Sequence, residues 1–416
     1  MIKDPEIFLH DLLQSALEAA DPIKSVPPNL PKRSKGRTIV IGAGKASAAM
    51  AKAVEQSWPD VAMEGLVVTR YGYAVLTEKI EIIEASHPVP DDAGEIACKR
   101  IMGLIQGLTE DDLVLALISG GGSALLSLPA PCLSAHEKRA LNKALLKSGA
   151  TIYEMNCVRK HLSAVKAGQL ALIAHPARVV TLIVSDVPGD DPHTVASGPT
   201  LPDNSTQAEA LAVIEKYNIE ISQAVRDWLG NPENETPKPN DPRFLSTEVK
   251  IVSRAQDSLL AAASYATSCG VEAVILGDSI EGEARAVAHE HVKLALDYLE
   301  NPPVVLLSGG ETTVTIKGGG KGGRNTEYAL AAVMAGSSHK QIYGLACDTD
   351  GIDGSEDNAG AIFTPDTLMN AKQLDIDPAS HLEKNDSYNF FKSAGGLVVT
   401  GPTFTNVNDF RAILVL

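Results

Sequence analysis

The sequence predicts an α/β protein whose N-terminal domain is built on a doubly wound parallel sheet. Three observations support this prediction. The chain has 416 residues, which is enough for two or three domains of ~100–200 residues each. Its strand candidates are continuously apolar, and this pattern indicates burial on both faces. Segments with helical spacing alternate with these short apolar runs, which is typical of strands joined by crossover helices.

The N-terminal half contains an opening helix followed by a series of strands. Asp4 and Pro5 predict the N-cap and first residue of an amphipathic helix that includes Leu17. Further helices are expected over Leu141–Glu154 and Leu162–Ala174. The strands are expected at Thr38–Ile41, Leu66–Thr69, Ile80–Ile83, Leu113–Ser119 and Val179–Ser185.

A second α/β series follows a proline-rich stretch at 231–242, which contains four prolines in twelve residues. Because prolines at this density prevent both helix and sheet, the stretch predicts a linker or a loop at a domain edge. We expect domains at 1–238 and 246–416. Thr313–Ile316 follows its preceding strand too closely for a crossover helix, so we expect a hairpin and a mixed second sheet. The strands of this half are expected at Val249–Val252, Ala273–Leu276, Val304–Leu307, Thr313–Ile316, Ile342–Ala346 and Leu397–Thr400, and the helices near Gln256–Thr267, Glu283–Leu299 and Thr326–Met334.

Composition narrows the classes of function. The chain has 36 Lys and Arg against 52 Asp and Glu, a net charge of −16, which opposes binding to nucleic acid or to an anionic membrane. Apolar runs such as Leu113–Ile118 and Val179–Val184 are six residues long, far short of the ~20 that span a membrane. Five widely spaced cysteines match neither a disulfide framework nor a zinc site. We therefore expect a cytoplasmic protein with small-molecule partners, and leave a homodimer open.

Two glycine-rich segments follow predicted strands, where ligands bind in open α/β sheets. The first contains Gly42, Gly44, Lys45 and Ser47. A cation at a helix start is disfavoured by the helix dipole, so Lys45 favours anion binding over a purely structural turn. In the second segment, consecutive glycines favour a nest of N–H groups for phosphate or carboxylate, with a structural turn as the alternative. It consists of Ser119, Gly120, Gly121, Gly122 and Ser123.

Three further segments carry charged groups suited to phosphate and metal chemistry. Asp186 and Asp190 lie in a Pro/Gly loop and could hold a magnesium ion or act as a base, although solvated turn residues are an equal alternative. A glycine loop with two cations before a helix favours phosphate binding over a mobile linker; it contains Gly320, Lys321, Gly322, Gly323, Arg324 and Asn325. An acidic loop after the strand at 342–346 predicts a magnesium or active-site loop, with Asp348, Asp350 and Asp353 as ligands.

Together, these motifs resemble the type II (MOFRL-type) glycerate kinases, some of which are named hydroxypyruvate reductases. The resemblance rests on the segments 40–47, 119–125, 158–163 with Lys166, 185–190, 308–314 with Glu311, 323–327 and 350–354. It implies a Rossmann-like N-terminal domain, a smaller α/β C-terminal domain and an active site in the cleft between them. It also implies ATP-dependent phosphorylation of D-glycerate with Mg²⁺, 2-phosphoglycerate being the favoured product. The family's catalytic lysine and arginine fall on Lys45 and Arg324. Ala167 departs from the expected glycine.

Two other functions compete with the kinase. An NAD(P)H-dependent hydroxypyruvate reductase would use the near-fingerprint at Gly42, Gly44 and Ser47. The second strand, however, ends in Thr69 and Arg70 rather than in an acidic residue that binds the ribose of NAD, and Arg70 would at most suit NADP. A non-catalytic sensor of nucleotides or sugar phosphates would need the same loops without turnover. The sequence contains no DNA-binding module that could transmit its signal.

Overall fold

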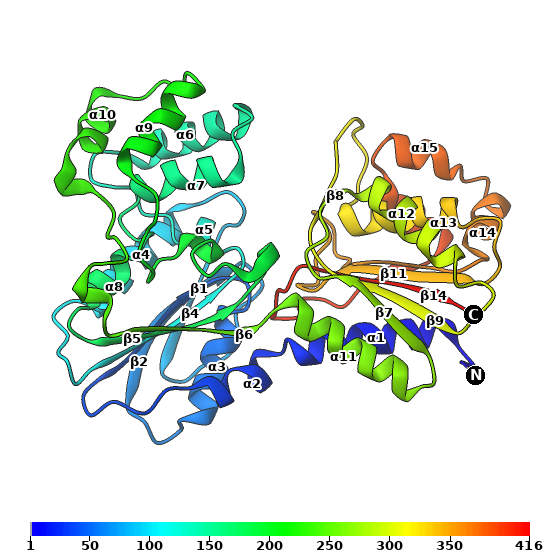
Figure 1. Ribbon diagram of the computed structural model, residues 1–416, viewed down its shortest axis with the longest axis horizontal. Coiled ribbons are helices and arrows are strands. Elements are labelled where there is room, and N and C mark those ends of the chain that lie inside the picture. The colour runs from blue at the N-terminus through cyan, green and yellow to red at the C-terminus, as the bar shows by residue number, and fades with distance from the viewer. Residues whose placement is uncertain (1) are drawn as a thin grey trace. The chain divides into compact units, whose positions relative to one another are not determined.

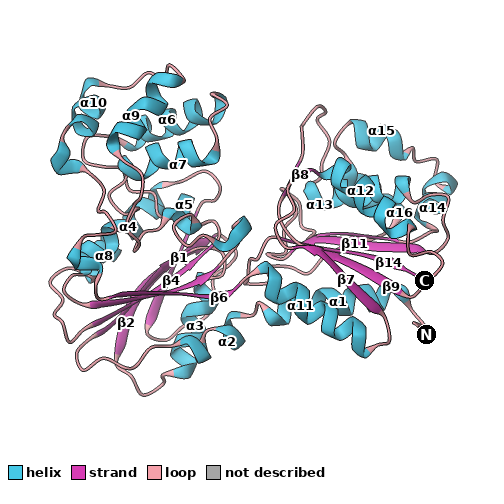
Figure 2. Cartoon of the chain, in the orientation of Figure 1, coloured by secondary structure: helices cyan, strands magenta, loops and turns pink. Residues whose placement is uncertain are grey.

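The computed structural model describes residues 2–416, and its contacts divide the chain into two compact units (Figures 1 and 2). One unit comprises Val26–Ile183 and Asp191–Val252. The other comprises the chain up to Ser25, the short segment Val184–Asp190 and the long segment Ser253–Leu416. We call them the sheet-and-bundle unit and the mixed-sheet unit.

The sheet-and-bundle unit contains a six-stranded sheet in the order β3-β2-β1-β4-β5-β6. The strands β3, β2, β1 and β4 run parallel, with Thr38 opposite both Met63 and Leu113. This order is that of a doubly wound sheet, so the predicted fold class is confirmed. The strands span β1 Thr38–Ala43, β2 Met63–Arg70, β3 Ile80–Ala85, β4 Leu113–Ser119, β5 Arg178–Val184 and β6 Thr247–Ser253.

Two groups of helices complete this unit. The first group lies along the sheet and consists of α3 (Ser47–Ser57), α4 (Asp92–Leu104), α5 (Gly122–Leu125) and α8 (Gln169–Ala174). The second group is a helical bundle with its own apolar core around Leu145, Val158 and Ile214, drawn above the sheet in Figure 1. It consists of α6 (Ala135–Lys147), α7 (Ile152–His161), α9 (Gln207–Lys216) and α10 (Gln223–Gly230).

Two expectations for the bundle region were wrong. The helix predicted over Leu141–Glu154 is interrupted, because Ser134 and Thr151 each form a capping box with a glutamate three residues later and start separate helices. The helix predicted over Leu162–Ala174 begins only at Gln169, after Gly168 with a positive φ of 82°. Capping chemistry therefore overrode the apolar spacing on which the prediction rested.

The region around the proline-rich stretch also differs from expectation. Residues 231–242 lie inside the sheet-and-bundle unit and do not connect the two units. There, Glu235 and Thr236 contact the buried His161 ring. The strand β6 follows this stretch and pairs with β5 as the edge of the first sheet, although the sequence suggested that it opened the second.

The mixed-sheet unit contains a second six-stranded sheet in the order β13-β12-β11-β14-β9-β7. Only β7 and β9 pair in parallel in the described part of this sheet; the other pairs are antiparallel. The expected mixed sheet is confirmed, but the expected hairpin is wrong, since β10 (Thr312–Thr313) pairs in parallel with β8 (Gly282–Glu283). The main strands are β7 Glu272–Gly277, β9 Val304–Ser308, β11 Ile342–Asp348, β12 Gly360–Phe363, β13 Leu397–Val398 and β14 Asp409–Val415.

Helices cover both faces of this second sheet. One face packs against α1 (Pro5–Ala19) and α11 (Ala255–Ser268), and the other against α12 (Ala284–Leu296), α13 (Arg324–Ala335) and α16 (Ser387–Ala394). Short helices α2 (Pro22–Ser25), α14 (Thr367–Gln373) and α15 (Pro378–Glu383) complete the unit. Burial on both faces explains why these strands are continuously apolar.

The first helix begins as the sequence predicts, with the Asp4 side chain accepting hydrogen bonds from the N–H groups of Glu6 and Ile7. However, α1 packs against α11 and so belongs to the mixed-sheet unit. The compact units therefore differ from the expected boundaries 1–238 and 246–416 in placing this helix with the C-terminal half. Among residues 2–416, none of the helices combines the length and the apolar character needed to cross a bilayer.

Candidate functional site

The two N-terminal glycine segments lie side by side at the carboxyl ends of β1 and β4. The Lys45 N–H donates to the Gly120 carbonyl at 2.9 Å, and the Ala46 N–H donates to Ser119 Oγ at 3.0 Å. Gly44 has a φ of 139°, and a Cβ there would collide with Ser119. Ser47 and Ser119 are fully buried, with their hydroxyls 3.1 Å apart. These two serines therefore hold the segments together, while the half-buried Lys45 is left at the edge of the sheet.

The second glycine segment turns sharply toward the helical bundle. Gly121 has a φ of 80° and precedes α5; a Cβ on it would lie 3.2 Å from the His87 ring and 3.4 Å from Lys45 Cγ. A Cβ on Gly122 would lie 2.7 Å from Ala196 Cβ. Both positions therefore need glycine for close packing, as does Gly42, which is buried in β1 against Leu117.

Ser123 ends this segment and opens onto a cavity. Its hydroxyl lies 2.8 Å from that of Ser197, and its carbonyl accepts a hydrogen bond from Lys166 Nζ at 2.7 Å. The cavity measures about 440 Å³. It is lined by Pro88, Val89, Pro90, Ser123, Ala124, Ser127, Lys138, Arg139, Asn142, Lys143, Leu146, Arg159, Lys166 and Ser197.

This cavity, which we call the cationic cavity, has five lysines and arginines in its lining and no aspartate or glutamate. Lys138 and Lys166 are only 7% and 3% exposed. Lys138 Nζ is buried and has no hydrogen-bond partner among the described residues. In a chain with a net charge of −16, such a concentration of positive charge marks a place suited to an anion.

The pKa shifts of these groups have a common cause. Burial is the main cause that lowers the pKa of Lys138 from 10.5 to about 8; Cys98 and Glu95 act to raise this pKa, and Arg159 acts to lower it. Burial likewise holds the pKa of Lys166 well below its usual range, with contributions from Lys138, Arg159 and Lys160. The pKa of Arg159 is also lowered by burial. The three cations disfavour one another, so an anion placed among them would relieve both the desolvation and the repulsion.

The sequence-predicted Arg324 lies in the other unit, at the first residue of α13. It forms three ion pairs: Nε with Asp409 at 2.8 Å, Nη1 with Glu311 at 2.9 Å and Nη2 with Asp348 at 2.9 Å. These carboxylates raise the pKa of Arg324 well above its usual value despite its burial. Asp409 is completely buried and is shared with Arg411 and Asn325. The fork of Arg324 is therefore held rigidly, with three of its five N–H donors engaged.

The predicted metal ligands do not form a metal site. Asp353 uses both carboxylate oxygens to cap α13, accepting from the Asn325 N–H at 2.9 Å and the Thr326 N–H at 2.8 Å. Asp348 is paired with Arg324, and its second oxygen accepts from the Asp350 N–H at 3.0 Å. Within residues 2–416, no group of three or more His, Cys, Asp or Glu side chains is arranged to hold a metal ion. Helix capping and ion pairing account for this acidic loop.

The predicted base candidates lie on the short segment 184–190 of the mixed-sheet unit. Asp186 Oδ2 accepts a hydrogen bond from Asn406 Nδ2 at 3.0 Å, and the Asp186 carbonyl accepts one from Asn408. The loop that carries these asparagines leads directly into Asp409, the partner of Arg324. Thus the fold brings Asp186 and Arg324 to the same loop. Asp190 has a positive φ of 55° and donates its N–H to Val187.

The glycine loop before α13 is fastened to the chain at 384–388. Lys321 donates its N–H to Asp386 and its ammonium group to Glu356, and the Gly320 N–H donates to the Lys384 carbonyl. A Cβ on Gly320, Gly322 or Gly323 would collide with Asp386, Ser387 or Asp353. These glycines therefore permit close packing. The sequence had instead suggested that they provide flexibility for binding phosphate.

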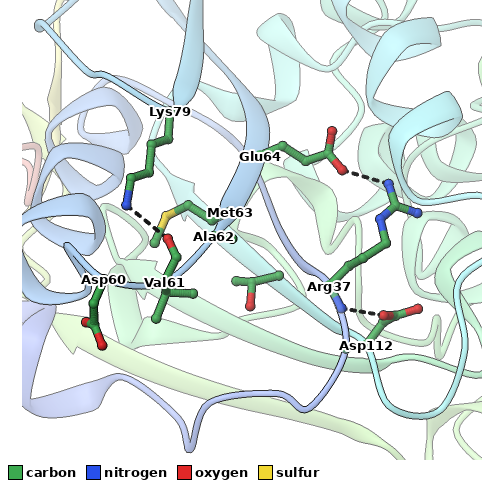
Figure 3. Close-up of a pocket in the computed structure, with 10 residues that line it drawn as sticks. Arg37, Asp60, Val61, Ala62, Met63, Glu64, Lys79 and Asp112 are labelled. Carbon is green, nitrogen blue, oxygen red and sulfur yellow. Dashed lines mark hydrogen bonds and ion pairs between the residues drawn. The ribbon is translucent and has the colours of Figure 1, made fainter.

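Another cavity, of about 780 Å³, lies at the amino ends of β1 and β2 (Figure 3). Its charged groups are engaged with the protein itself. Arg37 pairs with Glu64 at 2.7 Å, its N–H donates to Asp112, and Lys79 donates to the Val61 carbonyl at 2.9 Å. None of the sequence-predicted site residues lines it. Its polar groups already have partners, so it does not compete with the cationic cavity as a ligand site.

Lys138 lies in none of the sequence motifs. Arg159 and Lys166 belong to a motif that carries the family resemblance, but no role in the site was assigned to them. One signal was present. Ser134 and Glu137 form the capping box that starts α6, and the helical spacing of Lys138, Leu141 and Leu145 places them on one face. A lysine on the buried face of an amphipathic helix is unusual enough to indicate a function.

Comparison with known proteins gives consistent matches over the whole chain. The family described as "Domain of unknown function (DUF4147)" matches residues 8–230, and the MOFRL family matches residues 304–409. A protein of Agrobacterium vitis named "Putative hydroxypyruvate reductase" is 51% identical, covering 98% of this chain and 94% of its own length. The D-glycerate 2-kinase of Thermotoga maritima is 41% identical, covering 98% and 97%. The crystal structure of the glycerate kinase from that organism matches with a TM-score of 0.90 at 40% identity over 99% of both chains.

Proposed function

Since the chain belongs to the type II, MOFRL-type glycerate kinase family, we propose that it catalyses the ATP-dependent phosphorylation of D-glycerate and that the product is 2-phosphoglycerate. The names of its relatives from Thermotoga maritima and Pyrococcus horikoshii, D-glycerate 2-kinase and glycerate 2-kinase, support this choice of hydroxyl. Both substrates are anions. The observation that carries the proposal is the cationic cavity beside the glycine segment 119–123, in a protein whose net charge would otherwise repel them.

Phosphoryl transfer requires positioning and charge neutralisation more than covalent chemistry. In this proposal, Lys45 contacts the transferring phosphoryl group from the carboxyl end of β1, where ligands of doubly wound sheets bind. Arg324 contributes its remaining N–H donors to an anionic group. Asp186 or Asp190 accepts the proton of the substrate hydroxyl.

We propose that Mg²⁺ enters with the nucleotide. Mg²⁺ is commonly held by one or two carboxylates together with substrate phosphates and waters. A site formed by Asp348, Asp350 and Asp353 does not fit, because Asp353 caps α13 and Asp348 pairs with Arg324. Bound to the phosphates, Mg²⁺ would neutralise charge that develops during transfer.

An NAD-dependent reductase is opposed by the end of β2. An NAD-binding site places an acidic residue at this position to bind the adenosine ribose, and an arginine would at most suit NADP. Here β2 ends at Arg70, whose guanidinium lies 5.6 Å from the centre of the Tyr73 ring. In addition, the third position of the glycine fingerprint is Ser47, which is buried against Ser119.

The proposal is tested by measuring ADP release from ATP with D-glycerate and Mg²⁺, with L-glycerate and glycerol as controls. We expect D-glycerate-dependent ADP release. In a proton-coupled phosphorus NMR spectrum, a phosphate on the secondary carbon gives a doublet and one on the primary carbon gives a triplet, so the product should give a doublet. Oxidation of NADH or NADPH by hydroxypyruvate without any ADP release would overturn the proposal in favour of the reductase.

A further inference from the structure

The cationic cavity contains more positive charge than its own protein neutralises. Arg159 is held by Asn142, whose amide oxygen is 3.3 Å from Nε, and Lys166 donates to a backbone carbonyl. These partners are neutral, and no carboxylate lines the cavity. Lys138 belongs to the lining of the cavity. Its Nζ is buried and has no hydrogen-bond partner among the described residues, and the titratable groups that act on its charge are Glu95 and Cys98, which favour it, and Arg159, which opposes it. Burying an ammonium group without a partner is costly, and such groups persist where a ligand completes them.

Hydroxyl groups lie next to these cations. Ser123 and Ser197 line the same cavity with their hydroxyls 2.8 Å apart, and the Ser123 carbonyl is the acceptor for Lys166. Ser123 is the exposed end of the glycine segment that follows β4. The cavity therefore presents two kinds of group close together: buried cations that match an oxyanion and serine hydroxyls that match a neighbouring hydroxyl.

We propose that the cationic cavity is the acceptor-substrate site and that Lys138, Lys166 and Arg159 bind the carboxylate of a small hydroxy acid. This inference rests on the proposed function, and it assigns a role to these three residues that the sequence motifs did not assign. The Ser123–Ser197 pair orients the hydroxyl beside the carboxylate. Lys138 lies on α6 and Arg159 lies on α7. In this proposal the helical bundle therefore supplies two of the three positive charges that bind the carboxylate.

A phosphate of the nucleotide carries the same oxyanion chemistry, and the test separates the two sources. Lys138→Met and Lys166→Met remove each charge while retaining length and apolar bulk. Lys147→Met is the control, because Lys147 lies on the same helix but is exposed and outside the cavity. The KM for D-glycerate and the KM for ATP are measured separately for each protein.

We expect the KM for D-glycerate to rise ~10- to 100-fold in Lys138→Met and Lys166→Met, which corresponds to the loss of a charge-assisted hydrogen bond. The KM for ATP should stay within about threefold of wild type, because that is the scatter expected of changes remote from the nucleotide. Lys147→Met should match wild type. A rise confined to the KM for ATP would assign the cavity to the nucleotide and overturn the proposal, as would unchanged constants for both substrates.

A binding measurement makes the outcome independent of turnover. Thermal stabilisation of the wild-type protein by D-glycerate, by L-lactate as a second hydroxy acid and by inorganic phosphate is compared with that of Lys138→Met. Stabilisation by both hydroxy acids that is lost in the variant supports the assignment. If wild type releases no ADP but this stabilisation remains dependent on Lys138, the proposed kinase fails and the hydroxy-acid site stands. Stabilisation by phosphate alone overturns the site assignment.

Discussion

Replacing Lys138 with methionine should stabilise the protein without its ligand. The wild-type ammonium group is buried without a hydrogen-bond partner among the described residues, and burial lowers its pKa from 10.5 to about 8. Each tenfold change in proton affinity corresponds to ~1.4 kcal/mol, so the protonated amine is disfavoured in the folded protein by about 3 kcal/mol. Methionine has a similar length, and its thioether carries no such cost.

The stabilisation should depend on pH in a defined direction. Below pH 8 both the folded and the unfolded wild type hold the Lys138 proton, and the full cost is present. Between pH 8 and 10.5 the unfolded chain still holds the proton while the folded protein has lost it, so wild-type stability rises with pH. The advantage of Lys138→Met should therefore be greatest near neutral pH and should vanish as the pH approaches 10.5.

The assay is unfolding by urea and by heat at pH 7 and at pH 10, without ligand, for wild type, Lys138→Met and Lys147→Met. We expect Lys138→Met to gain about 2–3 kcal/mol at pH 7, or roughly 4–10 °C in Tm, and less at pH 10. The exposed Lys147→Met should differ from wild type by less than ~0.5 kcal/mol. A Lys138→Met variant that is less stable than wild type at pH 7 would refute the reasoning, because it would show that the ammonium group has a stabilising partner.

Further predictions concern the ligand and the supporting structure. If Lys138 binds the substrate as an ammonium ion, the KM for D-glycerate should rise ~10-fold per pH unit above pH 8. The titratable and charged groups near it are Arg159 and Lys166 together with Glu95 and Cys98 of α4. The KM profile of Lys138→Met should therefore depend less on pH than that of wild type, and the dependence that remains should come from Lys166, whose pKa burial also lowers. Lys45→Ala should lower kcat by ~100-fold or more with an unchanged Tm, while Lys52→Ala on the same helix region should behave as wild type; full activity in Lys45→Ala would remove its assignment. Arg324→Met should destabilise the protein by ~3–5 kcal/mol, because Asp409 and Asp348 would lose their buried cation, and an unchanged unfolding midpoint would contradict this. Gly44→Ala should unfold at lower temperature than Gly107→Ala, since both have a positive φ but only Gly44 also lacks space for a Cβ; equal midpoints would show that the contact with Ser119 relaxes.

Local sequence was sufficient to predict the sheets because each strand carries its own signal. Continuous apolar runs such as Leu113–Ser119 show burial on both faces, and the glycines after β1 and β4 mark turns that only glycine permits. The N-cap at Asp4 is equally local, since it depends on contacts within one helical turn. The family resemblance also depends on such local motifs, and their order along the chain indicated the same family.

The sequence by itself determined the fold class, the family and the positions of the glycine segments. Only the tertiary structure decided what those groups contact: β6 joined the first sheet, Asp353 became a helix cap, and Arg324 was surrounded by three carboxylates. The convergence of Lys138, Arg159 and Lys166 on one cavity was likewise decided at this level. The physical reason is range. Strand and turn signals act between residues adjacent in the chain, whereas the charge and burial of a side chain depend on segments that meet only when the helices pack.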